Sequence, residues 1–293
     1  MPKKSNSKLT LVILNYNSQF WLKKTLTTLK KHYLDKTNTS VKTIVVDNDS
    51  EDDSVELVKT EFPWVGLIES DKNLGFSAGN NLALKQVESQ YVMLLNNDVE
   101  FKPDSDLDQL VKFMDNHSKA AVCTPKLLLA DGSLDMACHR GEPTFWASVS
   151  YFIGLEKLFP QHQWFAQYHQ TYKNLDTIHN VDACSGAAML VRTKAMNQVG
   201  LLDERFFMYA EDLDWCKRFR EQGYDISYYP EIELIHHKYK SGIKTESDLT
   251  SIQAKQYFYN TMLQYYDKHY RDQYPGIYRW ILKMFIFLKK GGM

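Results

Sequence analysis

Runs of apolar residues alternate with amphipathic segments through the first hundred residues of the chain. Four runs have the β-branched or apolar character of buried strands: LTLVILNY (9–16), VKTIVVDNDS (41–50), GLIES (66–70) and YVMLLNND (91–98). Three segments between them carry apolar residues at helical spacing: 18–33, with Ser18 as a candidate cap, 52–62 and 77–87. Strands separated by helices predict right-handed crossovers and an α/β fold with a mostly parallel sheet and flanking helices.

Polar side chains stand where these strands end. They are Asn15 and Asn17 after the first strand, Asp47 after the second, and Asn96, Asn97 and Asp98 after the last. The carboxyl ends of parallel strands meet at one edge of a sheet, where α/β proteins bind their ligands. The sequence therefore predicts a binding site at this edge. It contains no GxGxxG or GxxxxGK[ST] motif, so neither a dinucleotide fingerprint nor a P-loop explains that site.

The remaining sequence indicates an insertion within a main domain, followed by a C-terminal extension. Residues 142–180 are rich in aromatic residues with weak periodicity, which indicates an insertion flanking the site. We expect residues 1–243 to form the main domain and residues 244–293 a C-terminal helical extension. In that extension, YRWILKMFIFLKK sets apolar residues between basic ones, which suits a helix lying on an anionic membrane surface. A helix packed on the domain explains the same pattern equally well.

Composition narrows the class of protein. A hydrophobic content of 44% and a charged content of 24% are ordinary for a globular chain, and a net charge of -1 gives no reason to expect a nucleic-acid partner. The four cysteines form no CxxC pair, which favours reduced thiols in a cytosolic protein. The N-terminal apolar run is too short for a secretory signal, and no segment reaches the roughly 20 apolar residues of a bilayer span. We expect the protein in the cytoplasm, either free or peripheral at the inner face of the plasma membrane.

Seven motifs between Leu9 and Ser241 resemble, in order and spacing, the family-2 glycosyltransferases. They are VILNYN, VVDNDSEDDS, NLGFSAGNN, LLNNDV, SGAAMLVR, GLLDERFFMYAEDLDWCKRFREQGY and HHKYKS. Each is weak alone, but together they are similar to the bacterial branch that includes rhamnosyltransferases. The resemblance implies a GT-A fold, a nucleotide-sugar donor, a divalent metal ion and inversion at the anomeric carbon.

The resemblance also implies a donor pocket. In the family, a carboxylate at the position of Asp47 holds the nucleobase, although capping of the next helix is an alternative role for it. Lys72 could pair with a phosphate. Gly75 and Asn80, in NLGFSAGNN, would line the pocket, and a simple turn explains the glycine as well. The strand-end residues complete the predicted donor-binding set: Asn15, Asn17, Asn96 and Asn97.

The motif LLNNDV occupies the place of the family's DxD motif, with Asn96 in place of the first aspartate. We expect Asp98 to bind Mg²⁺ or Mn²⁺ and Asn96 to orient the ribose or a metal-bound water, because a diphosphate donor supplies further oxygens to the ion. His236, in HHKYKS, is the expected second metal ligand. The sequence leaves open whether His236 or His237 takes that role.

The motif YAEDLDWCKRF supplies the predicted catalytic residues. The resemblance places the base that activates the acceptor at Asp212, with Glu211 as its neighbour, and an inverting transfer needs such a base near the acceptor hydroxyl. Capping of the following helix is a further role open to Asp212. Ser185, Gly186 and Ala187 match a segment that lines the acceptor side in relatives, and a tight turn accounts for them nearly as well.

These observations predict transfer of a sugar, expected to be a deoxyhexose such as rhamnose, from a dTDP- or UDP-linked donor. The acceptor would be a glycan or a polyprenyl-linked glycan in bacterial surface-polysaccharide synthesis. Two alternatives stay open. A processive synthase shares the fold, but Gly276 stands where the QxxRW motif requires glutamine. An inactive sugar-nucleotide-binding module would explain the missing first aspartate. A homodimer is also open.

Overall fold

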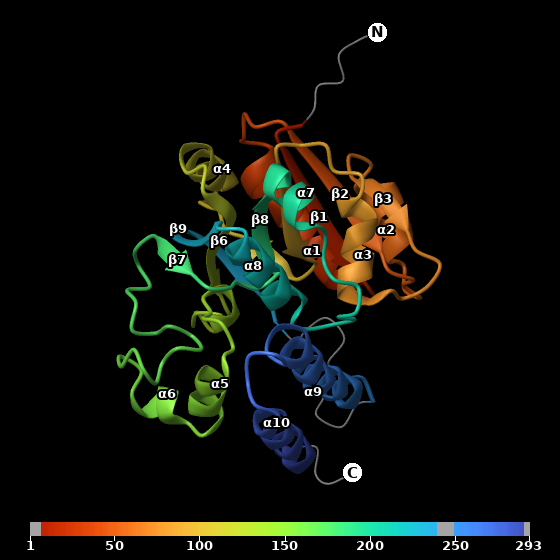
Figure 1. Cartoon of the computed structure of the whole chain (residues 1–293). Coiled ribbons are helices and arrows are strands. Elements are labelled where there is room, and N and C mark those ends of the chain that lie inside the picture. Colours follow the sequence, from red (N-terminus) through yellow and green to blue (C-terminus); the bar gives the residue numbers. More distant parts are fainter. Residues whose placement is uncertain (1–6, 239–248, 290–293) are drawn as a thin grey trace.

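One mixed sheet forms the centre of the molecule (Figure 1). The computed structural model describes residues 7–238 and 249–289. The strands run in the order β3-β2-β1-β4-β8-β6-β9-β5, and β7 pairs with β9. Their bounds are β1 Leu9–Asn15, β2 Val41–Asp47, β3 Gly66–Glu69, β4 Tyr91–Asn96, β5 Val99–Phe101, β6 Ala120–Leu128, β7 His179–Val181, β8 Ala188–Arg192 and β9 Asp225–His236.

The first four strands are parallel, as the sequence pattern predicts. Strand β1 lies between β2 and β4, and nearly all of its side chains are buried. A strand covered on both faces has no solvent side, so an almost unbroken apolar run forms it instead of an alternating one. This half of the sheet carries the carboxyl ends at which the polar residues were predicted to meet.

The second half of the sheet is mixed. Strand β9 runs parallel to β6, whereas β8 is antiparallel to both β4 and β6, and β5 and β7 are antiparallel to β9. Helical crossovers of the βαβ type do not connect these strands, so parallel pairing is not imposed on them. The predicted α/β class is confirmed, and the antiparallel pairs belong to the part of the sheet beyond β4.

Helices cover this sheet and extend beyond it. Their bounds are α1 Gln19–Leu29, α2 Ser54–Glu61, α3 Gly75–Leu84, α4 Leu107–Asn116, α5 Phe145–Phe152, α6 Leu155–Leu158, α7 Thr193–Val199, α8 Glu211–Glu221, α9 Leu249–His269 and α10 Gly276–Lys289, with a π-helical turn at Lys30–Leu34 and a 3₁₀ turn at Met136–Cys138. Ser18 holds the N-cap position of α1 as predicted, but its side chain makes no cap hydrogen bond. Asp52, from the loop after β2, accepts from Gln19 N at 2.9 Å and satisfies this helix end instead.

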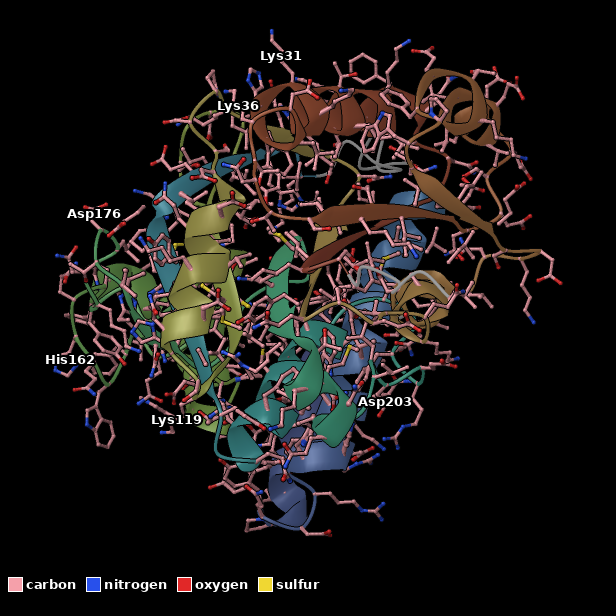
Figure 2. All side chains as sticks on the ribbon, turned by 90° about the horizontal axis from the view of Figure 1, so that it is seen from above. Lys31, Lys36, Lys119, His162, Asp176 and Asp203 are labelled. Carbon is pink, nitrogen blue, oxygen red and sulfur yellow. The ribbon has the colours of Figure 1, made fainter. Side chains whose placement is uncertain are left out.

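The predicted insertion, residues 142–180, contains α5, α6 and the loops that lead to β7. Figure 2 shows His162 and Asp176, both from this segment, at the outer margin of the molecule. Its first residue is firmly held, because Glu142 accepts from Lys217 of α8 at 2.5 Å and also from Arg220 and Tyr270. Burial alone would raise the pKa of Glu142, but these partners outweigh it and lower the pKa to about 2.

The predicted C-terminal helices are present, and α9 packs against α8. The fully buried carboxylate of Asp214 accepts from Arg218 at 2.8 Å and from His269 of α9 at 2.7 Å, and it also pairs with Lys268. In the part of the chain that the structure describes, no helix has both the length and the apolar content needed to cross a bilayer. The proposed boundary between residues 243 and 244, together with Lys240 and Ser241, lies outside the described residues, so the domain division stays a prediction.

Candidate active site

The polar residues at the ends of β1, β2 and β4 do gather at one edge of the sheet. The register pairs Asn15 with Asp47, and the last residue of β4, Asn96, lies opposite Leu14. The amide of Asn15 donates to Asp47 Oδ2 at 3.2 Å and accepts from Asn97 Nδ2 at 2.8 Å. The predicted convergence is therefore confirmed. We call this edge of the sheet, formed by Asn15, Asp47, Asn96, Asn97 and Asp98, the rim.

Several rim side chains also brace the loops that follow the strands. Asp47 Oδ1 accepts from Ser50 N at 2.9 Å, so this carboxylate stabilises the turn after β2. Asn17, which has a φ of 46°, accepts from Glu51 N at 2.7 Å and joins the β1 loop to the β2 loop. Asp47 does not cap α2, whose N-cap is Asp53, so the capping alternative is not realised and the carboxylate supports the preceding turn.

Three predicted donor-pocket residues lie on the segment between β3 and the end of α3. Lys72 is exposed on the loop after β3, at the same edge of the sheet. Gly75 has a φ of +76°, and a Cβ placed there would lie 2.3 Å from the carbonyl oxygen of Phe207. Asn80 is buried within α3 and donates to Phe76 O. Internal packing explains both Gly75 and Asn80 without a ligand.

The end of β9 brings an imidazole to the rim. Strand β5 pairs with β9 so that Val99 lies opposite His236, which places Asp98 beside the end of β9. His236 Nε2 lies 3.3 Å from Asp98 Oδ1 and 3.3 Å from the side-chain amide of Asn96. All three predicted residues around the expected metal position therefore meet, although His236 is more than a hundred positions away in the chain.

The neighbouring His237 faces another way. Its Nε2 lies 2.7 Å from Glu100 Oε2, its ring stacks on Trp21 with centroids 4.5 Å apart, and its backbone N–H donates to Asp98 O. The two successive imidazoles thus have distinct surroundings. The geometry favours His236 as the imidazole of the metal position and gives His237 a supporting role.

Asp135 is a site residue that the sequence analysis missed. It is 2% exposed, its Oδ2 lies 2.8 Å from His236 Nδ1, and its Oδ1 accepts from Lys238 at 2.9 Å. Burial alone would lower the pKa of His236, but the hydrogen bonds with Asp135 and Asp98 outweigh it and raise the pKa to about 9, so a metal ion at Nε2 has to displace a proton. A carboxylate on the far nitrogen fixes the ring orientation and tautomer of a metal-ligating histidine.

The chemistry of this cluster suits Mg²⁺ or Mn²⁺. Two ligand atoms at about 2.1 Å from an octahedral ion stand about 3 Å apart, so Asp98 Oδ1 and His236 Nε2, 3.3 Å apart, fit a shared ion. The amide of Asn96 offers an oxygen to the same position, because its oxygen and nitrogen can exchange places by a flip. No group of three or more His, Cys, Asp and Glu side chains in residues 7–238 and 249–289 forms a metal site alone.

The second predicted cluster lies at the start of α8. Tyr209 and Ala210 precede this helix with φ values of 70° and 64°. Two successive non-glycine residues in the left-handed region cost on the order of 1–3 kcal/mol each, and such strain gathers at functional sites. The helix itself begins with Glu211 and Asp212, and both carboxylates favour the positive end of the helix dipole.

Asp212 is held firmly in place. Its Oδ2 lies 2.6 Å from Arg140 Nη2, and its Oδ1 accepts from Leu213 N at 2.7 Å. Both side chains of the ion pair are largely buried. Ala210 and not Asp212 holds the N-cap position of α8, although Asp212 does accept from one free N–H of the first turn. Arg140 was not singled out from the sequence.

Glu211 has a different environment. It is 6% exposed, and its Oε2 has no hydrogen-bond partner within the described residues. Burial, followed by the charge of Asp212, raises the pKa of Glu211 well above its usual range. A buried carboxyl oxygen without a hydrogen-bond partner destabilises the folded protein unless a ligand supplies the missing hydrogen bond.

A short segment connects the two clusters. Arg140 N donates to Ala183 O, and four residues later Ala187 O accepts from Asn96 N. Four residue steps span at most about 14 Å of extended chain, so the backbone beside Arg140 and the backbone beside Asn96 lie within this distance of each other. Ser185, in the middle of this segment, is buried, and its Oγ has no partner within the described part of the chain.

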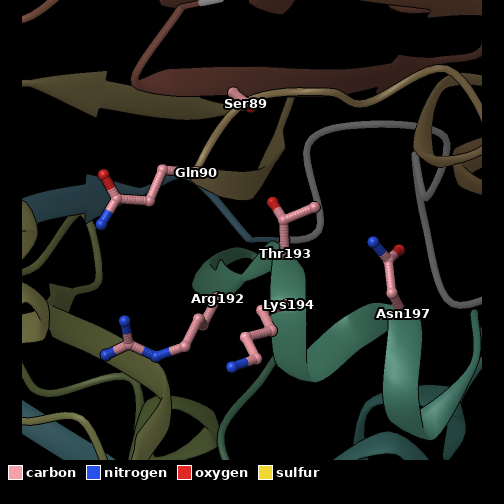
Figure 3. A pocket seen from close by; sticks show the side chains of 6 residues that line it. All are labelled: Ser89, Gln90, Arg192, Thr193, Lys194 and Asn197. Atoms are coloured by element: carbon pink, nitrogen blue, oxygen red, sulfur yellow. The ribbon is translucent and has the colours of Figure 1, made fainter.

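A cavity of about 400 Å³ lies elsewhere (Figure 3). It is lined by Ser89, Gln90, Arg192, Thr193, Lys194 and Asn197. Gln90 precedes β4, whereas Asn96 ends it, and six residues of strand span roughly 20 Å. This cavity is therefore at the opposite end of the sheet from the rim, and the guanidinium of Arg192 is already bonded to Ala120 O and Met114 O.

Solved glycosyltransferases share this architecture. A mannosyltransferase from Pyrobaculum calidifontis, solved with GDP-Man and Mn²⁺, aligns with a TM-score of 0.60 at 15% identity, over 97% of this chain and 70% of that chain. A structure of GalNAc-T7 with UDP, GalNAc and Mn²⁺ aligns with a TM-score of 0.59 at 13% identity. It covers 80% of this chain, but the present chain spans only 44% of that one. The fold is the predicted GT-A glycosyltransferase fold.

Residues 10–199 match the sequence profile of glycosyl transferase family 2, and the chain belongs to this family. It is 28% identical over 214 residues to the N-acetylglucosaminyl-diphospho-decaprenol L-rhamnosyltransferase of Mycobacterium tuberculosis, over 69% of this chain and 68% of that protein. It is also 28% identical over 242 residues to the rhamnosyltransferase WbbL of Escherichia coli K12, over 78% of this chain and 82% of that protein. The resemblance to the rhamnosyltransferase branch is confirmed, and the chain is a glycosyltransferase.

Proposed function

We propose that this glycosyltransferase moves a deoxyhexose such as rhamnose, with inversion and with the help of Mg²⁺ or Mn²⁺, from a dTDP- or UDP-linked donor. The acceptor is a glycan or a polyprenyl-linked glycan of a bacterial surface polysaccharide. The similarity to two rhamnosyltransferases, one of them named for a diphospho-decaprenol acceptor, supports this choice. The observation that carries the proposal is a metal-type cluster at the rim together with two buried carboxyl groups at the start of α8.

The donor lies along the rim in this proposal. Asp98, His236 and Asn96 would hold the divalent ion, and such an ion would supply positive charge to balance the leaving diphosphate. Asp47 holds the nucleobase, with Asn15, Asn17 and Asn97 beside it. Lys72 pairs with a phosphate, and Gly75 and Asn80 shape the pocket indirectly, through the packing of α3.

The acceptor hydroxyl approaches from the α8 side. Asp212 takes the proton of that hydroxyl, and Arg140 keeps the carboxylate in the orientation that this requires. Glu211 offers its free oxygen to a hydroxyl of the acceptor, which would complete the hydrogen bonding of a buried group. The oxygen of the acceptor then attacks the anomeric carbon from the face opposite the leaving nucleotide, so the configuration inverts.

The test compares Asp212→Asn with Glu221→Gln, an exposed change in the last turn of the same helix. We expect Asp212→Asn to lose transfer by at least roughly a hundredfold while donor binding, measured by calorimetry with Mn²⁺, stays within a factor of about two of the parent. Normal turnover by this variant would refute the assignment of the base. Donor binding by the parent with no turnover on any acceptor would favour the inactive sugar-nucleotide-binding module.

A further inference from the structure

Large apolar side chains are exposed mainly on two segments of this protein. Eleven of the fourteen exposed large hydrophobic side chains in the described residues belong to the insertion or to α10. One of them, Ile178, lies next to β7. The other ten are Trp146, Tyr151, Ile153, Leu158, Phe159 and Trp164 of the insertion, and Ile277, Trp280, Met284 and Phe287 of α10; we call this set the aromatic face. Concentrated apolar exposure of this kind marks a surface that another phase or molecule covers.

The exposed residues of α10 form a single stripe. Residues 277, 280, 284 and 287 follow the spacing of one helix face, about 15 Å long at 1.5 Å per residue. The opposite side of α10 packs on the protein, where Tyr278 meets Phe145 and Phe285 meets Phe152, with ring centroids 4.3 Å and 4.6 Å apart. Packing on the domain and contact with a membrane surface, the two alternatives that the sequence left open for this helix, are therefore compatible. One side of α10 packs inward and the other faces outward.

These ring contacts join the two segments into one surface. Phe145 and Phe152 lie on α5 of the insertion, and in Figure 1 α5, α6 and α10 lie together at the lower end of the molecule. This surface is rigidly tied to the catalytic region. Glu142 binds Lys217 of α8, and Asp214 of α8 binds His269 of α9.

The sequence of this C-terminal segment is basic. Residues 276–293 contain four basic residues, Arg279, Lys283, Lys289 and Lys290, and no acidic one, and Arg279 is paired with Asp267 of α9. Lys283 and, on the insertion, Lys157 are exposed beside the apolar residues. The acidic Glu156 is buried against His169 at 2.5 Å. Tryptophan, an apolar stripe and exposed lysines match the interface of a bilayer with anionic head groups.

We propose that the aromatic face docks on an anionic phospholipid bilayer, with α10 lying in the plane of the interface and α5 and α6 inserting beside it. This inference rests on the proposed function, because a polyprenyl-linked acceptor resides in such a bilayer. Docking holds the start of α8, with Glu211 and Asp212, at a fixed height above the lipid surface. The head of a lipid-linked glycan then reaches the acceptor side of the rim without leaving the membrane.

The experiment measures co-sedimentation of the full chain with phosphatidylcholine vesicles, with and without phosphatidylglycerol. The test variant is the double change Trp280→Ser and Phe287→Ser, and the matched control is Phe20→Ser, an exposed aromatic residue on α1. We expect the double variant to partition roughly tenfold less or weaker still, the control to bind like the parent, and Lys283→Glu to lose the preference for phosphatidylglycerol. All the changed side chains are exposed, and a thermal melt confirms folding.

Vesicle binding by the double variant equal to that of the parent would overturn the proposal. The proposal would also be overturned if the parent protein does not bind vesicles but forms a dimer that the double variant cannot form. A second copy of the chain would then cover this face. Hydrolysis of the donor and transfer to a short water-soluble acceptor are measured in parallel. Their loss with intact vesicle binding counts against the proposed function alone, and lost vesicle binding with intact transfer supports the docking face independently.

Discussion

Asp135 gives the sharpest test of the metal cluster, since it touches the proposed ligand His236 but lies behind it. Asp135→Asn preserves the shape of the side chain and a carbonyl oxygen for His236 Nδ1, 2.8 Å away, but removes the charge that it shares with Lys238. A hydrogen bond with a charged partner contributes about 1.5–3 kcal/mol, and each 1.4 kcal/mol is about tenfold in affinity. We therefore expect the metal ion to bind roughly 10–100-fold more weakly.

The assay titrates Mn²⁺ in sugar transfer at saturating donor, and calorimetry measures Mn²⁺ binding to the complex with the nucleotide. The half-saturating Mn²⁺ concentration should rise, and most of the activity should return at high Mn²⁺, because Asp135 orients the ligand without touching the reacting atoms. Asp131→Asn is the matched control, an exposed aspartate on the same loop that bonds only to Ser133 in the described structure. An unchanged Mn²⁺ dependence in Asp135→Asn would refute the positioning role, and an equal loss of activity at every Mn²⁺ concentration would indicate a different one.

Two further predictions concern stability. His139 is fully buried, with its Nε2 2.6 Å from His179 Nε2, and burial, then the charges of His179 and Lys173, lower its pKa to about 4. Because the unfolded chain takes up a proton near pH 6.5 that the folded chain resists, the contribution of His139 to the free energy of unfolding should be greatest above pH 6.5. It should fall by about 3 kcal/mol towards pH 4, a decline that urea titrations should find smaller in His139→Gln; an identical decline would contradict the reasoning. Gly75→Ala combines a positive φ with a clash at Phe207 O and should cost about 2–4 kcal/mol. Gly132→Ala, which has a positive φ but open space around it, should cost only about 1 kcal/mol, and equal costs would exclude the clash.

The first half of the fold follows closely from the sequence. Strands β1, β2 and β4 are nearly continuous apolar runs, and the rule that parallel strands share one carboxyl edge was enough to bring Asn15, Asp47 and Asn96 together. The pattern is local and the topology rule is general, so no long-range information was needed. The pairing of Asp98 with His236 came from family resemblance, because no periodicity connects strands β4 and β9.

The supporting residues could not be predicted in this way. Asp135 lies 101 positions from His236, and Arg140 lies 72 positions from Asp212, and neither occurs in a spacing that signals a partner. For Gly75, in contrast, the sequence suggested a functional role that the structure does not require. Its position in a glycine-containing motif suggested a ligand, whereas the conformation and the approach of Phe207 already require glycine there.

The buried carboxylate of Asp214 has a practical consequence for anyone dividing this protein. It draws Lys268 and His269 of α9 against α8, and Tyr265 and Tyr270 complete the same packed interior. A recombinant fragment ending at residue 243 would keep every proposed catalytic and metal-binding residue yet lose both of these partners of Asp214. Such a fragment would expose apolar surface beside Asp212, the proposed catalytic base. We expect it to aggregate during expression instead of serving as a minimal transferase.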